Sequence, residues 1–93
     1  MILNVDFINS DRDDKLENYI LSLLKSKFTQ SYIKSISVSI KRTQNKYFPF
    51  KLEIELNSKK GSFVHTQSEG DDSKIAVSKA IKSLEKQVLK IRA

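Results

Sequence analysis

Five basic residues near the end of the chain have the spacing of one helix face: Lys79, Lys82, Lys86, Lys90 and Arg92. At about 100° per residue they lie opposite an apolar stripe. This stripe consists of Val77, Ala80, Ile81, Leu84, Val88 and Ile91. Like charges four residues apart destabilise a helix by about 0.2 to 0.5 kcal/mol per pair, unless a polyanion lies along them. The pattern therefore favours a polyanion-binding helix, the alternative being a basic face kept for solubility.

The charge of the chain is unevenly distributed along its length. Residues 1–33 carry four basic and five acidic side chains, whereas residues 34–93 carry thirteen basic and six acidic ones. The net positive charge therefore lies in residues 34–93. A polyanion such as nucleic acid is the partner that this balance favours.

Length and composition restrict the class of protein. A chain of 93 residues forms one domain and buries only about 60 to 65% of its unfolded surface, which disfavours a deep enclosed active site. The absence of cysteine excludes a disulfide framework and a thiolate metal site. Asn4 and Asp6 interrupt the first apolar run, so we expect no signal peptide. No segment approaches the length of a membrane span, and we expect a cytoplasmic single domain over 1–93.

The hydrophobic period changes cleanly along the chain and predicts six elements. These are a strand over 3–7, a helix that ends near Phe28, strands over 35–41, 50–56 and about 62–68, and a helix over 74–92. Ser10 and Asp11 are the expected N-cap of the first helix, with carboxylates in its first turn and Lys25 and Lys27 in its last. The connection over 42–49 is too long for a two-residue turn and is expected to be a mobile hairpin loop.

The order of these elements predicts the fold class. Strands that alternate apolar and polar residues form a sheet with one apolar face, and two amphipathic helices are its natural cover. We therefore expect an α+β two-layer sandwich, with a four-stranded sheet and two helices on one face, in the order β-α-β-β-β-α.

Two segments carry a family resemblance. One runs from Lys27-Phe28 through Tyr32 to the strand over 36–40, and the other is the leucine, glutamine and basic pattern over 83–92. Together with the order of elements, they resemble the ribosome hibernation-promoting factors, a family that includes the ribosome-associated translation inhibitors and the sigma-54 modulation proteins. The resemblance covers nearly the whole chain, and it implies a fold akin to double-stranded RNA-binding domains with an extra first strand.

The resemblance implies a stoichiometric blocker of bacterial ribosomes, with neither enzymatic activity nor a cofactor or small-molecule substrate. Family members bind the small ribosomal subunit in the channel for messenger and transfer RNA and keep idle ribosomes inactive, as in stress or stationary phase. They contact ribosomal RNA through basic residues of both helices. By motif position, Lys27, Lys86, Lys90 and Arg92 match those residues. Lys25 shares the last turn of the first helix, while Lys79 and Lys82 rest on the helical periodicity alone.

Some positions depart from the family pattern. Ser83 stands where many members have a lysine, Lys74 where an aromatic residue is common, and the loop over 42–49 has its own sequence. The chain ends at Ala93, without the C-terminal domain through which long members pair ribosomes. The expectation is a short form, which would need a separate ribosome modulation factor to pair ribosomes.

Two other sets of residues have a simpler structural interpretation. His65 alternates with its neighbours along a predicted strand and is expected to be an ordinary sheet-surface residue, since no nucleophile or orienting partner accompanies it. Asp11, Asp13 and Asp14 resemble the start of a calcium loop but lack its glycine and closing glutamate, so helix capping is expected.

Tyr47 and Phe48 lie between Lys46 and Lys51 and have two interpretations. Aromatic side chains among cations can stack on unpaired bases, or they can pack within the loop and core.

The chain as a whole also has two alternatives to a ribosome-binding function. One is a general RNA-binding module that recognises duplex RNA by shape, and the other is a module whose basic helix docks on an acidic protein.

Overall fold

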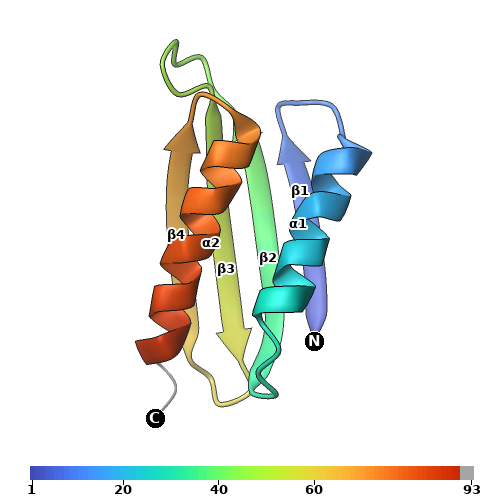
Figure 1. Ribbon diagram of the computed structural model, residues 1–93, viewed down its shortest axis with the longest axis vertical. Coiled ribbons are helices and arrows are strands. Elements are labelled where there is room, and N and C mark those ends of the chain that lie inside the picture. Colours follow the sequence, from blue (N-terminus) through green and yellow to red (C-terminus); the bar gives the residue numbers. More distant parts are fainter. Residues whose placement is uncertain (91–93) are drawn as a thin grey trace.

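The computed structural model of the protein describes residues 1–90. Its elements are β1 (Ile2–Ile8), α1 (Asp14–Lys27), β2 (Ile33–Arg42), β3 (Phe50–Ser58), β4 (Phe63–Gly70) and α2 (Ser73–Lys90) (Figure 1). The predicted order β-α-β-β-β-α is confirmed. The strands are one to three residues longer than the periodicity predicted, because the backbone pairing continues beyond the alternating residues.

The strands form one mixed sheet in the order β1-β2-β3-β4. β1 pairs with β2 in parallel, and α1 is the crossover that this parallel pair requires. The other two pairs are antiparallel. In the centre of the sheet Val38 lies opposite Ile54, which in turn lies opposite Thr66, so the alternating residues of all strands reach the same two faces.

Both helices cover one face of the sheet, as predicted. α2 packs over β3 and β4, and α1 lies over the β1 side (Figure 1). The core between the layers consists of apolar side chains from both. Among the largest that are fully buried are Ile20, Leu24, Phe28, Ile36, Ile54, Leu56 and Leu84. No element within residues 1–90 covers the opposite face of the sheet, and we call it the open face.

The start of α1 differs from the prediction. Asp13, rather than Ser10 or Asp11, is the N-cap, and its Oδ1 accepts a 3.1 Å hydrogen bond from the backbone N–H of Leu16. Leu16 is the first buried residue of the helix. This contact to the N–H three residues ahead is the usual one of an N-cap side chain, and it satisfies one of the free donors in the first turn.

Candidate nucleic-acid interface

The predicted two-sided character of α2 is present in the structure. Its buried residues are Ala76, Val77, Ala80, Ile81, Leu84 and Val88. Lys79, Lys82, Lys86 and Lys90 are all exposed, and we call this row the α2 stripe. Ile91 and the predicted contact residue Arg92 lie outside the described residues. Over residues 73–90 the helix has five lysines and one carboxylate, Glu85.

Two polar contacts fix α2 on β4. The Thr66 hydroxyl donates a 2.6 Å hydrogen bond to the Ser83 hydroxyl, and the Ser68 hydroxyl donates to the backbone carbonyl of Ala76. The helix therefore runs antiparallel to β4, and its last turns lie toward the β3–β4 turn (Figure 1). The Ser83 hydroxyl is bonded between the two layers. In this turn of α2, Lys82 beside it is therefore the residue that can contact a ligand.

The last turn of α1 reaches the same end of the molecule. Lys27 Nζ lies 3.2 Å from Glu85 Oε1, which joins the end of α1 to the last third of α2. Lys25 is exposed in the same turn of α1. The structure therefore brings Lys25 and Lys27 to the end of the molecule where α2 presents Lys86 and Lys90.

Three lysines that the sequence analysis did not select also lie at this end. Lys59 and Lys60 form the β3–β4 turn, and the backbone N–H of Lys59 donates a 2.7 Å hydrogen bond to the carbonyl of Tyr32, just before β2. Lys34, at the start of β2, is exposed beside them. The adjacent lysines before Gly61 were a signal for a basic turn, but their place depends on sheet pairing. We call the whole group the basic end: Lys25, Lys27, Lys34, Lys59, Lys60, Lys86 and Lys90.

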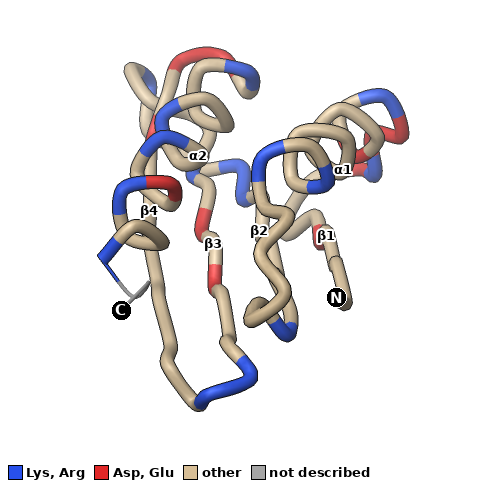
Figure 2. Tube along the Cα trace, turned by 60° about the horizontal axis from the view of Figure 1, so that its bottom comes forward, with Lys and Arg blue, Asp and Glu red and all other residues tan. Residues whose placement is uncertain are grey.

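Charge is separated along the long axis of the protein. Among residues 1–90, only Lys27 of the basic end lies within ion-pair distance of a carboxylate. Many of the acidic residues lie around the starts of the helices, and others lie on β1, on β3 and in the last third of α2 (Figure 2). At the start of α1, Arg12 is 2.7 Å from Glu17 and 3.3 Å from Asp14, and the hydrogen bond and charge of Glu17 raise the pKa of Arg12 further above its usual value. A polyanion therefore meets a nearly uncompensated positive field at the basic end.

The members of the α2 stripe differ in position. Lys86 and Lys90 belong to the basic end, whereas Lys79 lies eleven residues, about 16 Å, before Lys90 along the helix. Lys82 lies between them. The stripe therefore extends the basic end along the outer surface of α2, toward the middle of the molecule.

The open face of the sheet has the opposite charge. Its residues in register include the carboxylates of Asp6, Glu53, Glu55 and Glu69 and the ammonium groups of Lys41 and Lys51, a net charge of −2. His65 lies on this face, as the sequence analysis expected, with Nε2 4.0 Å from Glu53 Oε2. No nucleophile accompanies it in the described contacts, so the histidine has no catalytic arrangement there.

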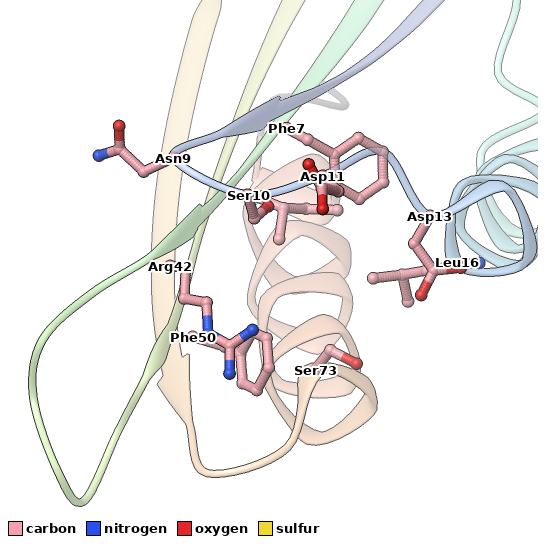
Figure 3. Close-up of a pocket in the computed structure, with 10 residues that line it drawn as sticks. Phe7, Asn9, Ser10, Asp11, Asp13, Leu16, Arg42, Phe50 and Ser73 are labelled. Carbon is pink, nitrogen blue, oxygen red and sulfur yellow. Dashed lines mark hydrogen bonds between the residues drawn. The ribbon is translucent and has the colours of Figure 1, made fainter.

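An open groove of about 720 Å³ lies between the starts of the two helices, at the end opposite the basic end (Figure 3). Phe7 and Phe50 supply its apolar surface, and the Arg42 guanidinium lies 5.6 Å from the centre of the Phe50 ring. Asp11 and Asp13 line one side, and Asp13 is committed to capping α1. Within residues 1–90 no group of three or more acidic or histidine side chains is placed to hold a metal ion.

A comparison with protein families decides the identity of the chain. The family model described as sigma 54 modulation protein / S30EA ribosomal protein matches residues 3–93. The chain belongs to this family. The resemblance inferred from the residues is thereby confirmed, and the two-layer fold is the one expected of an S30EA-family domain.

Two solved structures have the fold of this S30EA-family chain. A ribosomal subunit interface protein from Coxiella burnetii gives a TM-score of 0.86 at 20% identity, covering 99% of this chain and 98% of that one. The N-terminal domain of Protein Y from Thermus thermophilus gives 0.81 at 19% identity, covering 98% and 99%. No curated protein sequence matches the chain. Among residues 1–90, neither helix is long and apolar enough to cross a membrane.

Proposed function

We propose that the protein is a ribosome hibernation factor. It binds the small ribosomal subunit in the channel for messenger and transfer RNA, and so inactivates idle ribosomes and inhibits translation. The observation that carries this proposal is the basic end, where seven exposed lysines come from both helices, β2 and the β3–β4 turn, and where only Lys27 among them has a carboxylate within ion-pair distance among residues 1–90. The family membership supports the ribosome as the target.

Ribosomal RNA suits such a surface, because its closely spaced phosphates can be neutralised by lysines with release of counterions. If about five phosphates are engaged, affinity falls with salt at a log-log slope of roughly −3.5 to −4.5. Lys27, Lys86 and Lys90 make central contacts in this proposal. Lys25 and Lys82 make further contacts on either side of these three residues. Lys79 extends the contact surface along α2, and Arg92 extends it beyond Lys90 in sequence.

The two faces of the sheet give the orientation of the bound protein. The open face has a net charge of −2, and phosphates over its carboxylates would be repelled, whereas its two lysines, Lys41 and Lys51, lie at the edge next to the β2–β3 loop. The helix layer, with the α2 stripe and the last turn of α1, faces the RNA. The open face then points toward solvent or toward other parts of the ribosome.

The proposed action is binding without catalysis. The family is one of ribosome-binding factors, and occupancy of the channel is enough to exclude transfer RNA. The protein acts in the cytoplasm, with one copy per ribosome. Pairing of two ribosomes, if it occurs, uses a separate modulation factor.

Co-sedimentation with vacant ribosomes tests this function. The wild type is compared with a Lys86→Glu, Lys90→Glu double mutant at low and high salt, and with an excess of naked duplex RNA as competitor. We expect saturation near one copy per ribosome, resistance to the duplex, competition by initiator transfer RNA and loss of binding in the double mutant.

Two outcomes would contradict the proposal. Unsaturable binding that duplex RNA removes would identify a general RNA-binding module. Capture of a protein partner that survives complete RNase digestion, with no ribosome binding, would identify a protein-interaction module.

A further inference from the structure

The loop between β2 and β3 has several hydrogen bonds among its own polar groups. The Asn45 side-chain oxygen accepts hydrogen bonds from the backbone N–H groups of Tyr47, at 2.8 Å, and Phe48, at 3.1 Å. Thr43 closes the loop, since its hydroxyl donates to the Phe48 carbonyl at 3.0 Å and its N–H donates to the Pro49 carbonyl at 2.7 Å. These contacts reduce the freedom that the loop would lose on binding a ligand.

Tyr47 is presented to solvent by this loop. Its side chain is 78% exposed, whereas Phe48 is 44% exposed. The sequence analysis left base stacking and packing as alternatives for this pair, and packing in the core does not apply to Tyr47. An exposed tyrosine on a hydrogen-bonded loop offers a flat ring for stacking, and its binding costs little conformational entropy.

The loop and the strand ends next to it are basic. Residues 41–51 include Lys41, Arg42, Lys46 and Lys51 and no carboxylate. Lys41 and Lys51 lie directly opposite each other in the β2–β3 register. Like charges at opposed positions destabilise a strand pair, although the contact between Lys51 and Glu53, at 3.6 Å, relieves part of this repulsion. Lys51 also lies opposite Glu69 in the β3–β4 register, so Lys41 and Lys46 are the lysines of this segment without a carboxylate beside them among residues 1–90.

We propose that this loop is a second nucleic-acid contact, in which Tyr47 stacks on an unpaired base of RNA while Lys41, Lys46 and Lys51 hold the neighbouring phosphates. Single-strand binders combine these two elements, an aromatic platform and a cationic track. The inference rests on the proposed function, because the RNA is taken to be that of the small ribosomal subunit.

The loop contact is separate from the basic end. The loop lies near the start of α2, and Lys90 is at the other end of that helix (Figure 1). The 18 residues of α2 span about 27 Å, so one protein would contact two RNA segments at least that far apart. An RNA duplex bound only at the basic end would leave Tyr47 free.

The test measures the dissociation constant for isolated small ribosomal subunits at several salt concentrations. Tyr47→Ala is compared with Tyr47→Phe, which keeps the ring, and with Phe63→Ala, which removes an aromatic ring that is 57% exposed on the open face. Both side chains are exposed, so the temperature of thermal unfolding should be nearly unchanged in all three variants. We expect Tyr47→Ala to weaken binding by about 5- to 150-fold with an unchanged salt slope, and the other two variants to bind like the wild type.

A photoreactive amino acid at position 47 identifies the contacted molecule. We expect an adduct to ribosomal RNA at a nucleotide that is unpaired in the free subunit. Wild-type affinity of Tyr47→Ala, or an adduct only to a ribosomal protein, would overturn the loop contact. If either result is found and the Lys86→Glu, Lys90→Glu double mutant still does not bind, the loop inference alone fails. If the wild type does not bind the subunit, the proposed function fails as well.

Discussion

Lys27 of α1 and Glu85 of α2 form an ion pair of 3.2 Å, and this pair joins the last turn of one helix to the only carboxylate of the other. Both side chains are roughly half exposed, so the pair contributes little to stability. Its main consequence is electrostatic. Glu85 compensates part of the positive charge of the basic end, and Lys27 is positioned beside the α2 stripe.

Replacing Glu85 should strengthen ribosome binding. In Glu85→Gln the positive field of the basic end loses its only compensating charge, and Lys27 becomes free to contact a phosphate. An exposed charge interaction of about 0.5 to 1 kcal/mol corresponds to a gain in affinity of about two- to fivefold, measured by binding to small subunits at low salt. The matched control is Glu55→Gln on the open face, which should leave affinity unchanged. Equal effects of the two variants would mean that Glu85 does not face the RNA.

The hydrogen bond between Thr66 and Ser83 should appear as a coupling between β4 and α2. Ser83→Ala leaves the buried Thr66 hydroxyl without a partner, which costs about 1 to 3 kcal/mol of unfolding free energy. Thr66→Val removes the hydroxyl itself. Urea unfolding of the two single variants and the double variant should therefore give a double mutant that is more stable than the sum of the single changes predicts. Strict additivity would show that the two hydroxyls are not coupled.

The N-cap of α1 can be tested with two neighbouring aspartates. Asp13→Ala removes the acceptor for the Leu16 N–H and should lower the unfolding free energy by about 0.5 to 2 kcal/mol. Asp11→Ala is the matched control and should change it by less than about 0.5 kcal/mol, because an exposed substitution away from a cap has little effect. Urea unfolding checks both, and a larger loss from Asp11→Ala would move the cap back to the position expected from the sequence.

The sequence was sufficient for the elements and the layers. The period of the apolar residues shows which face of an element is buried. Examples are the alternation around Val38 and Ile54 in the strands and the helical spacing of Leu16, Ile20 and Leu24 in α1. The same rule placed the lysines of the α2 stripe in solvent. It failed at the start of α1 because several aspartates in succession can each cap a helix, and only the position of Leu16 against the sheet selects Asp13.

The basic end was less accessible from the sequence. Lys59 and Lys60 are far from both helix ends of the basic end in sequence, and their place beside these ends follows from sheet pairing and from the direction of α2 on β4. Lys34 is close to α1 in sequence, but its place beside Lys59 also depends on sheet pairing. The ion pair between Lys27 and Glu85 depends on where along their lengths the two helices come together. Periodicity describes one element at a time and contains no information on such distances between elements.

The most direct measurement is the affinity of isolated small ribosomal subunits for two double mutants with the same change of charge. Lys86→Glu, Lys90→Glu alters the basic end, whereas Lys15→Glu, Lys74→Glu alters exposed lysines at the starts of the helices. We expect the first to bind at least about 30-fold more weakly and the second to remain within about threefold of the wild type, because the contacts are local and screened. Equal losses in both variants would contradict a binding site at the basic end and would leave only a general attraction between a basic protein and RNA.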